Sequence, residues 1–214
     1  MRNLFRSLAL ALALSLVAGF AHALAAEPVA GTNYEVLKNA HPTSAPPGKV
    51  EVIEFFWYAS PQCYKLEPAI EAFVEKEGDR IVFKRVPVAF KDEFLPHSQL
   101  YYSLVSLGLE EKLTPAVYNA IHQQHWKLLS RDDQADFLAT QGVDKIKFLF
   151  AYDAVNVARQ VMQTAELAFH DYQIEYLPTL VVAGRYKIST VNNGPEGMAT
   201  VLDYLVKQVQ DKKL

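Results

Sequence analysis

The chain has 214 residues, of which 50% are hydrophobic and 21% are charged. This is the composition of a globular protein with a buried core, and it excludes a disordered chain. The formal net charge of −3 argues against a nucleic-acid binder, which would usually be basic. The length predicts one domain, or one domain that carries a large insertion.

The first 25 residues have the pattern of a secretory signal peptide. Arg2 and Arg6 form a basic start, residues 8–20 are apolar, and residues 21–25 offer two small-x-small cleavage sites. The alternative is a retained membrane anchor, but an apolar run of this length is short for a membrane span. We expect Sec export, and no stable membrane insertion after the signal peptide is removed.

A strand, a helix and a second strand follow in close succession. Residues 50–57 form an apolar, β-rich run typical of a buried strand, and residues 34–37 allow a short strand before it. Ser60 and Pro61 begin a helix that ends at Gly78. Residues 81–86 form the next strand, which completes a βαβ unit.

The pattern is then helical from about residue 96 to residue 172. Three points in it are interpreted as helix starts and one as a helix stop: Pro115, Ser130 and Asp144 for the starts, and Gly142 for the stop. Two strands at 179–183 and 186–188 are joined by a tight turn at Gly184-Arg185. A final helix is expected over about 195–212, so a βαβ half and a ββα half flank a helical insert.

Cys63 is the only cysteine of the chain. No intramolecular disulfide can therefore form. A single cysteine in an exported protein indicates either an intermolecular partner or a free thiol. A small buried apolar residue is the alternative interpretation of Cys63.

Residues 55–68, Phe-Phe-Trp-Tyr-Ala-Ser-Pro-Gln-Cys-Tyr-Lys-Leu-Glu-Pro, resemble the active-site segment of the DsbA-type thiol:disulfide oxidoreductases. Residues 141–144, 176–179 and 182–186 are similar to other landmarks of that family. The resemblance implies an α/β, thioredoxin-like fold over residues 26–214 with an inserted helical domain at about 96–172. It also implies a location in the periplasm of a Gram-negative bacterium, unfolded or extended polypeptides as partners, and a membrane redox partner as in the family. No cofactor is expected.

The active-site segment departs from the family pattern Cys-Pro-His-Cys. Ser60 stands at the position of the nucleophilic cysteine, and Gln62 at the position of the usual histidine. Disulfide transfer needs a thiolate at the helix N-terminus and a second cysteine to receive the disulfide. A serine cannot form a disulfide, so we expect that the protein cannot cycle one. Ser60 then either caps the helix or donates a hydrogen bond to a bound thiolate.

Pro178 matches the proline that is cis in thioredoxin-like folds and faces the start of the active-site helix. An extended peptide can add as a strand to the backbone beside it, and this binding needs no cysteine. The resemblance therefore implies a substrate-binding surface formed by Gln62, Leu177, Pro178 and Thr179. The alternative is a trans proline that simply precedes a strand. Tyr176 and Leu177 replace the usual Gly-Val pair.

Glu54 interrupts the apolar run of its strand. A buried acid is costly unless it is neutral or paired. The family has an acid at this place beneath the active site, which implies a proton-relay role. The alternative is that Glu54 points to solvent at the end of the strand.

Other candidate sites are weaker. His122 and His125 lie three residues apart on an expected helix, but no third metal ligand is evident, so we interpret them as surface histidines and expect no metal site. The aromatic residues Tyr101, Tyr102, Tyr118 and Trp126 fit the spacing of a helical core. No Gly-rich phosphate loop and no Ser-His-Asp arrangement is recognisable.

Three functions remain open. The first is a member of the DsbA-type family that no longer cycles a disulfide but keeps a peptide-binding role. The second is a glutathione-dependent transferase or isomerase in which Ser60 activates the glutathione thiol. The third is a single-cysteine redox protein that acts through Cys63.

Overall fold

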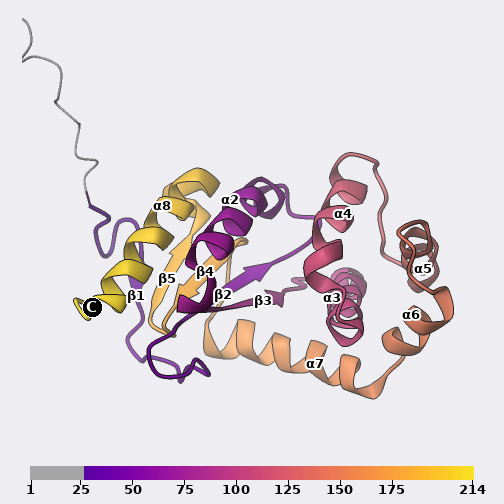
Figure 1. Cartoon of the computed structure of the whole chain (residues 1–214), viewed down its shortest axis with the longest axis horizontal. Helices are drawn as coiled ribbons and strands as arrows, with labels where there is room; N and C mark the ends of the chain where they lie inside the picture. The colour runs from indigo at the N-terminus through magenta and orange to yellow at the C-terminus, as the bar shows by residue number, and fades with distance from the viewer. Residues whose placement is uncertain (1–26) are drawn as a thin grey trace, which may run out of the picture.

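The computed structural model describes residues 27–214, and the predicted signal peptide lies outside these residues. The described chain is a five-stranded mixed sheet with helices on both faces and a group of helices at one end (Figure 1). The elements in chain order are β1 (Glu35–Val36), β2 (Val50–Phe56), α2 (Pro61–Glu77), η1 (Gly78–Arg80), β3 (Ile81–Pro87), η2 (Asp92–Phe94), α3 (Leu95–Leu107), α4 (Glu110–His122), α5 (Arg131–Thr140), α6 (Lys145–Tyr152), α7 (Val155–Ala165), η3 (Glu166–Asp171), β4 (Thr179–Val182), β5 (Tyr186–Ser189) and α8 (Thr190–Gln210).

The strand order is β1-β5-β4-β2-β3, with β2 and β3 parallel and the other pairs antiparallel. This is the arrangement expected when a βαβ half and a ββα half share one sheet. Every residue of β2 is buried, which explains its almost continuous apolar sequence. The register sets Phe55 opposite Thr179, so the end of β2 lies beside the start of β4.

The helices α2 and α8 cover one face of the sheet, and η3, which continues α7, packs against the other (Figure 1). Leu66 and Ile70 of α2 meet Val52 and Leu202 in one core cluster. Ala168 and Tyr172 meet Phe55 in a second cluster on the opposite face. The central strand is thus enclosed by apolar layers on both sides.

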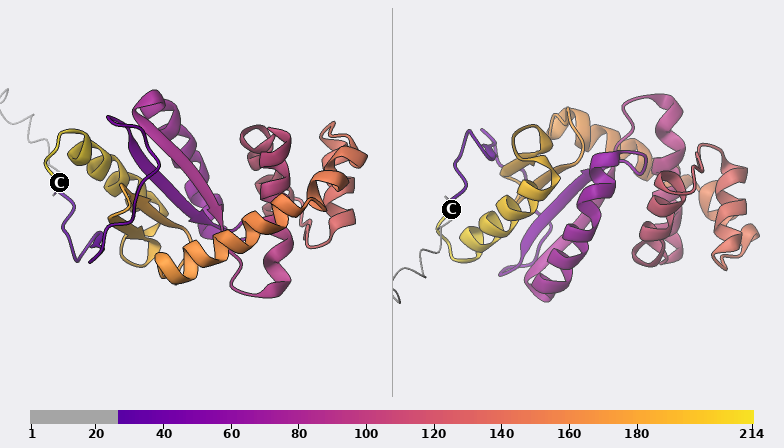
Figure 2. Two further views of the ribbon diagram at one scale, coloured as in Figure 1. Left: turned by 90° about the horizontal axis from the view of Figure 1, so that it is seen from below. Right: turned by 90° about the horizontal axis from the view of Figure 1, so that it is seen from above.

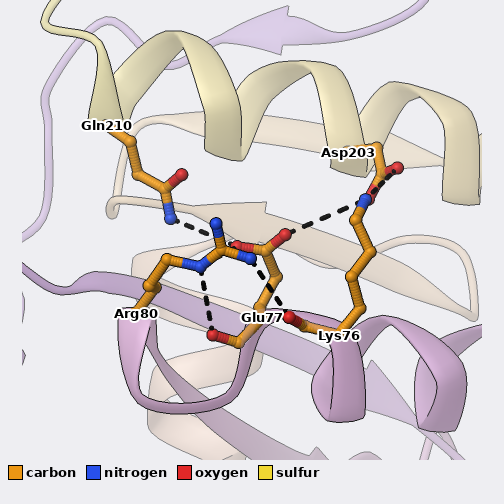
Figure 3. Close-up of polar contacts among 5 residues, drawn as sticks. All are labelled: Lys76, Glu77, Arg80, Asp203 and Gln210. Atoms are coloured by element: carbon orange, nitrogen blue, oxygen red, sulfur yellow. Dashed lines mark hydrogen bonds and ion pairs between the residues drawn. The ribbon is translucent and has the colours of Figure 1, made fainter.

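Polar contacts join the end of α2 to α8 (Figure 3). Arg80 donates to the carbonyl of Lys76 at 3.1 Å, while Lys76 pairs with Asp203 at 2.6 Å. The nearly buried carboxylate of Glu77 accepts a hydrogen bond from Gln210 at 3.3 Å. The Lys76–Asp203 and Glu77–Gln210 contacts link the two helices, although the exposed Lys76–Asp203 pair adds little stability by itself.

The helical insert packs around Leu104, Val117, Phe137 and Phe148, in a core cluster that continues into Phe56 and Cys63 of the sheet half. Ser130 and Asp144 cap α5 and α6 as predicted, because their side chains accept hydrogen bonds from the amides of Asp133 and Lys147. Gly142 follows the end of α5 with a φ of 81°. Within the described residues, no helix is long and apolar enough to cross a membrane.

Three details of the helical prediction are wrong. Pro115 does not start a helix; it lies inside α4, which begins at Glu110, two residues after the left-handed Gly108. His125 is not on a helix, because α4 ends at His122. Trp126 lies beyond the same end and is 37% exposed, so it is not a core residue like Tyr101 and Tyr118.

The final helix also begins earlier than predicted. α8 starts at Thr190, and a non-helical Gly194 with φ 61° and ψ 172° separates its first turn from the segment that Pro195 begins. The predicted turn between β4 and β5 is present. Gly184 is required there, since a Cβ atom would lie 2.3 Å from the carbonyl oxygen of His41.

Candidate active site at the start of helix α2

Ser60 caps the helix that follows the central strand. Its backbone is extended, with φ −77° and ψ 118°, and its hydroxyl oxygen accepts a hydrogen bond from the amide of Cys63 at 3.2 Å. Pro61 occupies the first helical position, where a missing amide hydrogen costs nothing. The local sequence therefore produces a capped helix start within the segment that resembles the family's active site.

Cys63 is completely enclosed. Its side chain is 0% exposed and belongs to the core cluster that includes Phe56 and Tyr58. Burial raises the pKa of its thiol to about 12, the charge of Glu54 acts in the same direction, and contacts with Ser60 and the Trp57 backbone oppose them. The thiol is neutral at pH 7, so it is a weak nucleophile.

Aromatic rings surround this helix start. Tyr64 stacks on His122 with ring centroids 4.5 Å apart and an interplanar angle of 3°. Nε2 of His122 donates to the carbonyl of Tyr58 at 2.8 Å. His122 is thus half-buried and part of the wall beside the site, so the prediction of a surface residue is wrong for His122, whereas His125 is exposed as predicted.

The Leu177–Pro178 peptide bond is cis. Pro178 is buried, Leu177 is half-buried between two core clusters, and Tyr176 is 52% exposed. Thr179 is buried, and its hydroxyl donates to the carbonyl of Tyr176 at 2.8 Å. Because Thr179 lies opposite Phe55, this segment is at the end of the sheet from which β2 leads to Ser60.

Glu54 is fully buried, so the alternative that it points to solvent is wrong. Its Oε2 atom accepts a hydrogen bond from Nε of Arg85 at 3.0 Å. The same guanidinium donates to Glu67 at 2.6 Å and to Glu110 at 3.2 Å. Three carboxyl groups from β2, α2 and α4 therefore share one cation, and Arg85 is only 9% exposed.

One guanidinium cannot neutralise three carboxylates, so the cluster holds protons. Burial raises the pKa of Glu54, although the charge of Arg85 opposes this shift. Burial and the neighbouring Glu54 raise the pKa of Glu67 to about 8. Glu54 Oε1 and Glu67 Oε2 are buried without a hydrogen-bond partner among the described residues. A neutral carboxyl group costs less free energy at such a place than a charged one.

The chain is similar to several DsbA proteins along nearly its whole length. It is 57% identical over 206 residues to the thiol:disulfide interchange protein DsbA of Burkholderia cepacia, covering 96% of this chain and 97% of that protein. It is 39% identical to DsbA of Pseudomonas aeruginosa PAO1, covering 97% of each. No protein-family model matches the chain.

The chain belongs to the DsbA family. Among solved structures, that of Pseudomonas aeruginosa DsbA matches with a TM-score of 0.80 and 38% identity, over 87% of this chain and 96% of that one. Reduced DsbA1 of Neisseria meningitidis matches with a TM-score of 0.75 and 28% identity, over 88% of this chain and 98% of that one. The prediction of a thioredoxin-like fold with an inserted helical domain is confirmed.

This DsbA-family protein has one cysteine at the start of α2. Ser60 and Cys63 lie at the start of α2, which follows directly on the strand that carries Glu54, and negative charge on Glu54 would raise the pKa of the Cys63 thiol further. Pro178 and Thr179 lie at the same end of the sheet, while Gln62 is exposed on the first turn of α2. Among the described residues, no group of three or more His, Cys, Asp or Glu side chains is placed to hold a metal ion.

Sequence reasoning missed the partners of Glu54 and a buried histidine. Arg85, Glu67 and Glu110 lie on separate elements, and their charges look like ordinary surface residues in the sequence. His97 is 2% exposed, accepts a hydrogen bond from the indole of Trp57 at 2.8 Å, and donates to the carbonyl of Lys127 at 2.9 Å. The sequence held one signal for the buried charge cluster: Arg85 lies among apolar residues in a predicted strand.

Proposed function

We propose that this DsbA-family protein does not cycle a disulfide and instead binds unfolded or extended polypeptides beside Pro178. The observation that carries the proposal is that Cys63 is the only cysteine of the chain. A disulfide that is passed to a substrate must first exist in the protein. A membrane partner that regenerates such a disulfide has no cysteine pair to act on here.

The surroundings of the two active-site residues support the first part of the proposal. Ser60 is 7% exposed, and its oxygen is engaged by the helix cap. Cys63 is closed off from solvent and its thiol pKa is about 12. These features weigh against activation of a glutathione thiol by Ser60, and against a mixed disulfide that forms readily at Cys63.

Exposed apolar side chains support the second part. Tyr176 is 52% exposed directly before the Leu177–Pro178 bond, and Val191 is 60% exposed at the start of α8. The pairing of Thr179 with Ser189 sets these segments at one end of the sheet. Exposed apolar groups beside free backbone are what an extended polypeptide needs for binding.

The location belongs to the same proposal. The pattern of residues 1–25 and the family resemblance support export to the periplasm of a Gram-negative bacterium. There the protein would meet newly exported chains before they fold.

Binding of a reduced, unfolded polypeptide tests the proposal. A fluorescently labelled segment without charged residues should bind the protein, and Tyr176→Asp and Val191→Asp should each weaken binding several-fold. Lys212→Asp, at the exposed far end of the chain, serves as the control and should leave binding unchanged. Equal binding by all four proteins would contradict the proposed surface.

A further inference from the structure

A cavity of about 810 Å³ follows the outer side of β3, away from the start of α2. Its lining includes four consecutive residues of that strand, Phe83 to Val86. Side chains of a strand alternate between the two faces of its sheet, so consecutive residues line one cavity only where it runs along the strand edge. A cavity of this size lies in the range that binds ligands.

The backbone of β3 is open at that edge. β3 is the last strand of the sheet, and within residues 27–214 it pairs only with β2. Figure 2 shows it on the side of the sheet that faces the helical insert. An open edge carries unpaired amide and carbonyl groups that can pair with another strand.

Negative charge surrounds the edge. Glu71 and Glu75 of α2 and Glu111 of α4 line the cavity, are exposed, and form no ion pair within the described part of the chain. They lie on two separate elements that both border the cavity. A ligand in the cavity meets carboxylates from both helices.

The two cations of β3 do not counter this charge. The amine of Lys84 lies 2.7 Å from Glu51, and Arg85 is held by Glu54, Glu67 and Glu110. Basic side chains usually protect an edge strand from pairing with another chain. Lys84 and Arg85 are both paired with carboxylates of the protein itself. They therefore do not repel a basic segment that approaches the edge.

The cavity also has apolar and aromatic walls. Phe83, Tyr101 and Tyr102 line it, together with Val74 and the 38% exposed Val105. Aromatic faces attract ammonium and guanidinium groups as well as apolar side chains. The site therefore offers a strand edge, apolar contact and unneutralised carboxylates in one place.

We propose that the β3 edge is a second polypeptide-binding site, which accepts an extended segment that alternates lysine or arginine with apolar residues. The segment adds to β3 as a further strand, its cations contact Glu71, Glu75 and Glu111, and its apolar side chains contact Phe83 and Tyr102. The site does not use the surface beside Pro178, so it holds whether or not that surface binds polypeptides.

The test uses the full chain without its signal peptide and a labelled eight-residue peptide that alternates lysine and valine. Fluorescence anisotropy should show binding, and a glutamate–valine peptide should bind at least tenfold more weakly. Binding should weaken as salt rises from about 50 to 300 mM, because the contacts with the carboxylates are screened. Equal affinity for the two peptides, or no binding of either, would overturn the proposal.

Variants separate this site from the surface beside Pro178. The double variant Glu71→Lys/Glu75→Lys should weaken binding at least tenfold, whereas Asp132→Lys/Asp133→Lys, with the same change of charge on α5, should stay within twofold. Val105→Trp fills the cavity without changing charge and should also weaken binding, while Tyr176→Asp should not.

Amide NMR shifts induced by the peptide should fall on Val82 to Arg85. Shifts confined to Gln62 and Thr179, or unchanged binding by the glutamate variants, would overturn the assignment.

Discussion

The hydroxyl oxygen of Ser60 accepts a hydrogen bond from the amide of Cys63 at 3.2 Å, so Ser60 is the N-cap of helix α2. The cap satisfies an amide that would otherwise be unpaired inside the protein. A serine at this position therefore maintains the helix start without a second cysteine. The role of Ser60 in this account is structural.

The first prediction concerns that cap. Ser60→Ala should destabilise the protein by about 1 kcal/mol, the usual cost of removing an N-cap oxygen. Urea denaturation measures this change. Ser130→Ala is the matched control, since Ser130 caps α5 through the same contact at 3.2 Å. If Ser60→Ala lowers the free energy of unfolding several times as much as Ser130→Ala, Ser60 has a role beyond capping the helix.

The second prediction concerns the thiol of Cys63. Because it is fully buried and burial raises its pKa to about 12, it should react with a small aromatic disulfide far more slowly than a free thiol at pH 8. In denaturant the reaction should reach the free-thiol rate. A native rate equal to the denatured one would show that the site is open.

The third prediction follows from the protonated carboxyl cluster. The folded protein keeps a proton on Glu67, whose pKa is about 8, whereas the unfolded chain releases that proton near pH 4.5. The folded state therefore binds more protons between these values, and stability should fall as pH rises through about 8.

Glu67→Gln should remove this pH dependence. Between pH 6 and pH 9 its free energy of unfolding should exceed that of the native chain by on the order of 1–3 kcal/mol. Glu75→Gln, two turns further along α2 at an exposed position, is the control and should leave the pH dependence unchanged. A parallel pH profile for Glu67→Gln and the native chain would contradict the assignment of the proton.

The fourth prediction concerns His97. Burial lowers its pKa below the ordinary 6.5. Just below pH 6.5, His97 therefore stays neutral in the folded protein but is protonated in the unfolded chain. Its contribution to stability is complete above about pH 6.5 and is lost as pH falls below that value. Once protonated, Nδ1 can no longer accept the hydrogen bond of Trp57.

Tryptophan fluorescence in a Trp126→Phe background reports Trp57 alone, since the chain has two tryptophans. It should change in a single step with a midpoint below pH 6.5, and the step should be absent in His97→Phe. Persistence of the step in His97→Phe would assign it to another group.

The fold was predictable where local signals agree. The apolar run of β2, the Ser60-Pro61 start of α2 and its end at Gly78 each have a local cause, and each lies where it was predicted. Pro115 was misleading because a proline is expected near a helix start. In α4 its side chain is exposed, so water can satisfy the carbonyl that its missing amide leaves free.

The site was predictable only in part. Ser60, Cys63 and Pro178 could be placed because they lie in recognisable segments. The partners of Glu54 could not, because Arg85, Glu67 and Glu110 meet only after three elements have packed. Trp126 follows the end of α4, so a helical spacing that includes it has no structural basis.

Oxidation of a reduced, unfolded substrate tests the central claim most directly. The native chain should not exceed the uncatalysed rate, whereas Ser60→Cys should form a disulfide with Cys63 in air and give measurable turnover. That pair should be a weaker oxidant than an intact Cys-Pro-His-Cys pair, because Gln62 carries no positive charge to stabilise the thiolate and hence the reduced form. Turnover by the native chain at the rate of Ser60→Cys would contradict the account.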